Sequence, residues 1–204
     1  MSKLVFNYAA MNSGKSMDLI RTIYNYEENG QKVLVMKPEV DTKGGDMIET
    51  RAGLSRKVDI VIPKSADILP LLVGMLDDVK CIFIAEAQFL SSRQAKQLLI
   101  ISSILDISVI CYGLRTNYKG ELFEGSSELM ALADEINEFK GLCTCGKIAR
   151  FNARRVNGKY VRTGADVVID GTDGVEYVPL CGRCFVSDVL MFDAEKTKKF
   201  VKKR

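Results

Sequence analysis

A short Gly-Lys-Ser sequence near the N-terminus constrains this chain more than any other feature. Gly14, Lys15 and Ser16 follow the apolar stretch KLVFNY and precede apolar residues at helical spacing. A strand, a glycine turn and a helix in this order form a phosphate-binding loop. In such a loop, backbone N–H groups and the lysine hold phosphate oxygens, and the hydroxyl binds Mg²⁺. The sequence therefore predicts phosphate binding here, with Ser16 as a magnesium ligand.

One position departs from the full phosphate-loop pattern. A second glycine is expected five residues before Gly14, and Ala9 stands there. Alanine is small, and it can replace glycine wherever the backbone does not need a positive φ. The sequence therefore still predicts a phosphate loop, provided that the backbone at Ala9 does not need a positive φ.

Apolar runs alternate with helical patterns through the first 140 residues. We expect strands at 3–8, 32–38, 58–63 and 107–114, and a further strand that runs into a polar tip within 79–90. We expect helices at 16–29, 65–78, 91–106 and 126–139. Because the strands are continuous apolar runs separated by helices, they predict an α/β fold with a parallel sheet covered on both faces.

The pattern changes after residue 140, where short alternating runs, turn residues and paired cysteines follow. We predict an α/β domain at 1–140, a small β lobe at 141–193 and a basic tail at 194–204 that is solvated rather than packed. The tail and the stretch ARFNARR leave open a nucleic-acid-binding module. The net charge of only +3 and the few aromatic residues in these runs argue against that alternative.

Four of the six cysteines form two tight pairs in the second region. The spacings are Cys143-x-Cys145 and Cys181-x-x-Cys184, with 35 residues between the pairs. Two such pairs predict a closed, structural Zn²⁺ site with four thiolates, which would stabilise a lobe with a small core. The remaining thiols, Cys81 and Cys111, lie in apolar runs and are expected in the core.

The chain contains no histidine, so any general base must be another residue type. Glu86 lies in IFIAEAQF, at the carboxyl end of an apolar strand. Ligands of parallel sheets bind at this edge. Glu86 is therefore the predicted base for a substrate hydroxyl.

Several ordered stretches resemble thymidine kinases of the second type, the bacterial and animal cytosolic family. The stretches are AAMNSGKS, FIAEAQFL, CYGLRTNYKGELFEGS, CTCGK and VVIDGTDGVEYVPLCGRC, and the resemblance spans about residues 3–190. It implies transfer of the ATP γ-phosphoryl to the 5′-hydroxyl of thymidine, with Mg²⁺. The implied fold is a P-loop domain with a zinc-bearing lobe, whose lasso loop covers the nucleoside.

The resemblance also implies roles for individual residues. Glu86 matches the family's general base. The residues that match ATP-binding positions are Ala9, Ala10, Met11, Asn12, Ser13, Gly14, Lys15, Ser16, Lys43 and Gln88. The residues that match the thymidine pocket and its lasso are Met11, Leu114, Tyr118, Phe123, Val168, Ile169 and Tyr177.

Two departures from the family pattern bear on activity. Ala85 stands where the family carries an aspartate that helps to hold hydrated Mg²⁺, and the lasso is about two residues longer than usual. The first departure leaves an alternative open, in which the chain is a nucleotide- or nucleoside-binding protein of kinase ancestry with impaired or no catalysis. The second bears on nucleoside specificity.

The expected setting is the cytoplasm. No segment approaches the roughly 18 consecutive apolar residues of a membrane helix, and the N-terminus lacks a signal-peptide pattern. We expect thymidine and ATP as ligands, with neither nucleic acid nor membrane as a partner. The family resemblance further implies a homotetramer and feedback inhibition by thymidine triphosphate.

Overall fold

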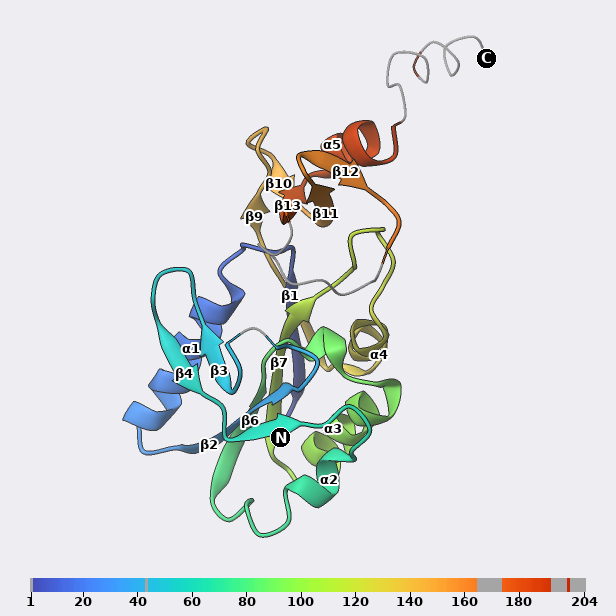
Figure 1. Ribbon diagram of the computed structural model, residues 1–204. Coiled ribbons are helices and arrows are strands. Elements are labelled where there is room, and N and C mark those ends of the chain that lie inside the picture. The colour runs from blue at the N-terminus through green and yellow to red at the C-terminus, as the bar shows by residue number, and fades with distance from the viewer. Residues whose placement is uncertain (1, 43, 165–173, 192–197, 199–204) are drawn as a thin grey trace. The chain divides into compact units, whose positions relative to one another are not determined.

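The structure is a computed structural model that describes residues 2–42, 44–164, 174–191 and 198 (Figure 1). The chain divides into two compact units. The first comprises Met1–Ala9, Gly14–Arg115 and Leu122–Phe139, and the second comprises Ala10–Ser13, Thr116–Glu121 and Lys140–Arg204. Two short loop segments that precede residue 140 thus belong to the second unit.

A six-stranded parallel sheet forms the centre of the first unit, with the order β5-β2-β6-β7-β1-β8. The strands are β1 (Leu4–Ala9), β2 (Lys32–Pro38), β5 (Ile60–Ile62), β6 (Val79–Ile84), β7 (Ser108–Leu114) and β8 (Glu135–Phe139). The predicted parallel sheet is confirmed, and the apolar runs supply its central strands because these are buried on both faces.

Helices cover both faces of this sheet (Figure 1). Helix α1 (Lys15–Glu28) packs on one face through Leu19 and Ile23. On the other face, α2 (Ile68–Leu71), α3 (Ser92–Ile104) and α4 (Glu124–Leu132) contribute buried leucines and isoleucines to a larger core. Residues of β2, β6 and β7 therefore enter two separate apolar clusters, one on each face.

Local sequence explains where the two long helices begin and end. Helix α1 starts after Gly14, and Gly30 follows its end with a φ of 70°. Ser91 caps α3, since its side chain accepts a hydrogen bond from the N–H of Gln94 and the Gln94 side chain accepts one in return. These signals are the reason the helix predictions at 16–29 and 91–106 are confirmed.

The predicted helix at 126–139 is wrong in its second half. Helix α4 ends at Leu132, and β8 follows as a sixth strand on the edge beside β1. The N–H of Leu4 donates to the Asp134 carboxylate and the N–H of Asp134 donates to the Leu4 carbonyl, both at 2.8 Å. This pair directs the chain into parallel register, so a tertiary contact overrides the helical pattern.

Two further expectations need correction. The helix expected at 65–78 is only the single turn α2, since Gly74 adopts a φ of 75° that ends helical geometry. The stretch 41–57, for which the sequence predicts neither helix nor strand, contains a hairpin of β3 (Met47–Glu49) and β4 (Ser55–Lys57). Ile48 of this hairpin is buried in the same cluster as helix α1.

The second unit is built from short antiparallel strands. They are β9 (Gly141–Leu142), β10 (Ile148–Ala149), β11 (Phe151–Val156), β12 (Lys159–Val161) and β13 (Val175–Leu180), and β11 lies between β12 and β13. A helical segment, α5 (Gly182–Cys184) with Phe185–Val189, closes the described part. Across both units, none of the described helices has the length and apolar character needed to cross a bilayer.

Candidate functional site

The loop between β1 and α1 has the backbone geometry of a phosphate-binding turn. Asn12 and Gly14 adopt left-handed conformations, with φ of 61° and 81°. Ala9 is the last residue of β1, is 3% exposed and has extended backbone. Since that position needs no positive φ, alanine replaces glycine there without conformational cost. The phosphate-loop prediction required that Ala9 have no positive φ, and the structure meets this requirement.

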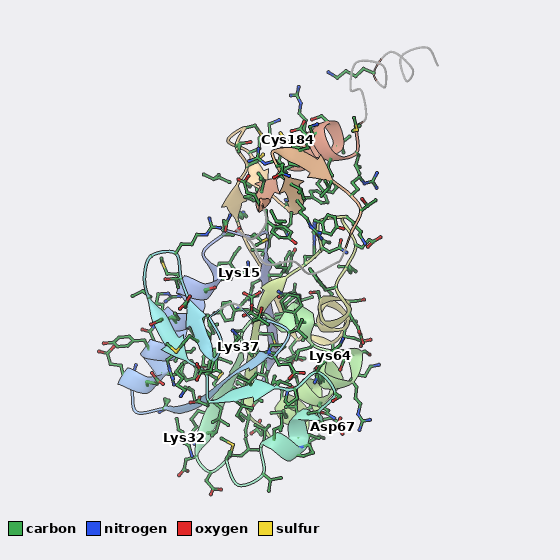
Figure 2. All side chains as sticks on the ribbon, in the orientation of Figure 1. Lys15, Lys32, Lys37, Lys64, Asp67 and Cys184 are labelled. Atoms are coloured by element: carbon green, nitrogen blue, oxygen red, sulfur yellow. The ribbon has the colours of Figure 1, made fainter. Side chains whose placement is uncertain are left out.

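Lys15 occupies the first turn of α1 and is only 8% exposed (Figure 2). Burial lowers the pKa of its ammonium group below the ordinary 10.5, and the carboxylate of Glu86 opposes part of that shift. The same electrostatic interaction means that Lys15 and Glu86 act on one region of the first unit. A desolvated lysine at a helix N-terminus attracts an anion strongly.

Glu86 has a strained backbone at the carboxyl end of β6. Its φ of 48° is left-handed, which is rare for a residue with a long side chain. It begins the turn Ala87–Phe89, and its carboxylate accepts a hydrogen bond of 2.6 Å from the amide nitrogen of Gln88. Strain of this kind is typical of functional sites, where the surrounding structure holds the conformation.

Close packing holds the turn after Glu86. The carbonyl oxygen of the Gln88 side chain accepts a hydrogen bond from the Leu114 N–H at 3.0 Å, and the Leu114 carbonyl accepts one from Ser126. A Cβ atom at Gly113 would lie 2.9 Å from that Gln88 oxygen, and one at Gly125 would lie 2.5 Å from the Ala87 carbonyl. The two glycines therefore allow β7 and α4 to approach the turn.

Ala85 precedes Glu86 and is buried, with 3% of its surface exposed. Its N–H donates to the carbonyl of Met36 in β2, and the next β2 residue is Lys37. Lys37 is 1% exposed and pairs with Asp41 at 2.7 Å. A buried lysine of β2 and a carboxylate shortly after that strand therefore form an ion pair near the position where the resemblance places an aspartate.

Residues of the pocket implied by the resemblance fall in both units, which we describe separately. In the first unit, Phe123 precedes α4 and packs edge-on against Phe89, with ring centroids 5.7 Å apart. In the second, Tyr118 is 1% exposed, and its hydroxyl donates to the Gly164 carbonyl at 3.0 Å. Tyr177 lies in β13. Lys43, Val168 and Ile169 lie outside the described residues.

Sequence reasoning missed two side chains on β11. Asn152, 3% exposed, accepts a hydrogen bond from the Met11 N–H at 2.8 Å and donates one to the Thr116 carbonyl at 3.0 Å. Arg154, two residues further on, is 4% exposed. The stretch ARFNARR reads as a solvated basic run, and only the period of two between Asn152 and Arg154 signals a shared strand face.

The four cysteines of the second unit come together. Their sulfur atoms all lie within 4.8 Å of one another, and Cys145 is 3.6 Å from both Cys143 and Cys181. Sulfur atoms of a tetrahedral zinc–thiolate site are about 3.8 Å apart, given Zn–S bonds of about 2.3 Å. The residues therefore fit Zn²⁺, and the predicted cysteine cluster is confirmed.

The pKa values of the thiols within this cluster are shifted in opposite directions. Burial raises the pKa of the Cys143 thiol, but the N–H groups of Cys145 and Cys181 and two neighbouring thiols outweigh it, giving about 6. The pKa of Cys184, by contrast, rises to about 12, mainly because its side chain is hydrogen-bonded to Cys145. The backbone thus favours a thiolate, which is the form that binds a metal.

The parallel sheet, the glycine turn before α1 and the buried lysine define a nucleotide-binding protein of the P-loop class. Sequence comparison narrows that class. A model of the thymidine kinase family matches residues 2–185. The chain belongs to the thymidine kinase family, whose members are nucleoside kinases.

Individual relatives agree with this assignment. A thymidine kinase of Ruegeria pomeroyi is 40% identical over 185 residues, covering 89% of this chain and 92% of the relative. One of Enterobacteria phage T4 is 41% identical over 185 residues, covering 89% and 94%. One of Coxiella burnetii is 38% identical over 190 residues, covering 91% and 95%.

Proposed function

We propose that this protein transfers the γ-phosphoryl group of Mg-ATP to the 5′-hydroxyl of thymidine. The single observation that carries the proposal is the strained, held conformation of Glu86, whose charge also acts on the pKa of the buried Lys15. A base that removes the hydroxyl proton and a cation that holds the donor phosphates are the two charges that this reaction needs together.

ATP binds through the loop from Ala9 to Ser16. Backbone N–H groups at the start of α1 and the ammonium group of Lys15 bind phosphate oxygens, and the Ser16 hydroxyl is a ligand of Mg²⁺. The bound anion adds a second negative charge beside that of Glu86, so binding raises the lowered pKa of Lys15. Lys43 adds charge near the triphosphate in this proposal.

Glu86 takes the proton from the nucleoside hydroxyl. Gln88 positions it, because the amide nitrogen of Gln88 binds the carboxylate and its oxygen is fixed by the Leu114 N–H. The resemblance lists Gln88 among nucleotide contacts, but both ends of its amide are already engaged by protein groups. Orientation of the base is therefore the role that these hydrogen bonds support.

Thymidine contacts Met11, Leu114, Tyr118 and Phe123 in this proposal, with Val168, Ile169 and Tyr177 contributing from the lasso. Both backbone groups of Leu114 are held by side chains, Gln88 and Ser126. Asn152 binds the backbone of Met11. Within its own unit, each of these two positions therefore has a fixed backbone, which supports its proposed role in binding a flat base.

Zn²⁺ held by Cys143, Cys145, Cys181 and Cys184 is structural. All four ligand positions are filled by thiols, so the metal has no open position for substrate. By analogy with the family, we further propose a cytoplasmic homotetramer that thymidine triphosphate inhibits. Analytical ultracentrifugation and inhibition kinetics test these two points.

Catalysis is tested by phosphorylation of thymidine by the purified protein across a Mg²⁺ titration. We expect turnover by the parent chain, its loss in Glu86→Gln, and unchanged turnover in Glu28→Gln, which alters an exposed glutamate at the end of α1. Turnover that survives Glu86→Gln contradicts the role of Glu86.

The alternative of a binding protein without catalysis receives no support from the comparisons, and Ala85→Asp separates it from the proposal. If the parent does not phosphorylate thymidine at high Mg²⁺ and the Ala85→Asp variant does, the alternative is established. Turnover by the parent excludes it and makes Ala85 a tolerated variation.

A further inference from the structure

A guanidinium group stacks on the tyrosine ring inside the second unit. The central carbon of the Arg154 guanidinium lies 3.5 Å from the centroid of the Tyr118 ring. Tyr118 is 1% exposed and Arg154 is 4% exposed, so the pair is removed from water. A separation this short is that of a planar stack, the arrangement that arginine makes with aromatic faces.

The same pair is fixed at its edges. The Tyr118 hydroxyl donates to the carbonyl of Gly164. Gly164 has a φ of 111°, which residues with a side chain rarely adopt. A Cβ atom at Gly164 would lie 3.5 Å from a guanidinium nitrogen of Arg154 and 4.0 Å from the Tyr118 hydroxyl. Arg154 is also the register partner of Tyr177 on β13, at 5.7 Å from that ring.

Core filling alone does not explain an arginine at this position. An apolar side chain of similar length would occupy the same volume without the cost of desolvating a charge. A guanidinium plane, by contrast, fixes the tilt and the rotation of the ring beneath it. The adjacent Arg155 has no such placement, since its side chain is 33% exposed and pairs with Glu176.

We propose that Arg154 is a positioning residue that holds the Tyr118 ring in the orientation that binds the nucleoside base. The inference rests on the proposed function, in which Tyr118 contacts the thymine. Arg154 acts through the ring and not on the phosphoryl donor, so its loss weakens thymidine binding and leaves ATP binding intact.

The experiment measures kcat and the two KM values for the parent, Arg154→Lys, Arg154→Met, Tyr118→Ala and Arg155→Met. Arg155→Met is the matched control, because it removes the same charge from the neighbouring position on β11. We expect both Arg154 variants to raise the KM for thymidine roughly threefold to thirtyfold, the range of a stacked cation. The KM for ATP should change less than about twofold.

Lysine keeps the charge but not the plane, so Arg154→Lys should not rescue thymidine binding. Zinc content per chain confirms that each variant is folded before its kinetics are compared. Arg154 variants with a lower melting temperature but an unchanged KM for thymidine would show a structural role only, and overturn the inference.

Failure of the proposed function gives a different result. A parent that does not phosphorylate thymidine, or a Tyr118→Ala variant with an unchanged KM for thymidine, overturns the pocket and the inference together. A raised KM in Tyr118→Ala with an unchanged KM in both Arg154 variants overturns only the inference. A double variant in which the two effects do not add supports it, because residues in contact are energetically coupled.

Discussion

The amide of Gln88 joins Glu86 to Leu114: its nitrogen donates to the carboxylate at 2.6 Å, and its oxygen accepts from the Leu114 N–H at 3.0 Å. The backbone N–H fixes which end of the amide is the acceptor. Gln88 therefore transmits the position of β7 to the proposed base on the turn after β6.

Gln88→Leu should lower kcat by about tenfold, since Glu86 loses the donor that orients it, a change of about 1.4 kcal/mol. Initial rates at saturating thymidine and ATP measure the effect. Gln31→Leu, at an exposed position, is the matched control. An unchanged kcat in Gln88→Leu contradicts the positioning role.

Lys15→Met should lower kcat/KM for ATP by about 100-fold or more, because the donor phosphates lose their nearest cation. The ligand-free variant should be at least as stable as the parent, since a desolvated charge has been removed. Lys32→Met, which changes an exposed lysine of β2, controls for loss of charge (Figure 2). Weakened folding without loss of ATP binding argues against the assignment.

The pH dependence of stability gives a second measure of Lys15. Its pKa in the folded chain is below 10.5, so between the two values the unfolded chain binds more protons. The contribution of Lys15 to the free energy of unfolding therefore rises with pH through that window. Urea unfolding at several pH values should show the gap between Lys15→Met and the parent narrowing towards pH 10.5. A stability difference that widens as the pH rises would contradict a lowered pKa of Lys15.

Gly125→Ala should destabilise the first unit by roughly 1–3 kcal/mol, because its Cβ atom would lie 2.5 Å from the Ala87 carbonyl. The turn that follows Glu86 must shift, so kcat should fall as well. Ser127→Ala, two residues further along α4 and exposed, should change neither quantity. Normal stability in Gly125→Ala would falsify the close approach of α4 to the turn.

Removal of zinc should release four reactive thiols per chain. Cys81 and Cys111 are both 0% exposed in the core of the first unit, so a reagent reaches neither in the folded protein. Without the metal, the small second unit loses its main stabilising bonds, and its four thiols become accessible. A thiol reagent should therefore detect almost none in the metal-loaded chain, four after chelation and six in denaturant. Cys143→Ser should lower the zinc content below one per chain, whereas Cys111→Ala should retain it.

The sequence predicts the first unit well where local and tertiary preferences agree. Apolar runs mark five of the strands, and Ser91 and Gly30 mark helix ends by their own backbone chemistry. Strand β8 escapes prediction because EINEF carries two glutamates and continues a helical pattern. Only pairing with β1, joined through Asp134 and Leu4, makes it a strand.

The candidate site divides in the same way. Gly14, Lys15 and the four cysteines can be predicted from the sequence because their chemistry requires fixed spacing along the chain. Asn152 and Arg154 are not, since each acts on a segment that is distant in sequence. A polar residue on a short strand does not indicate its partner until the strand is packed.

The hydrogen bond from Met11 to Asn152 joins residues 141 positions apart. During synthesis, the segment Ala10–Ser13 therefore leaves the ribosome long before the strand that binds it exists. At about 5–20 residues per second, this interval is on the order of 10 seconds. The segment spends that time without its final partner, and the metal cluster, completed by Cys184, forms later still. A chain that terminates before Asn152 cannot form this bond, so translational pausing in the last third of the message affects the first loop of the protein.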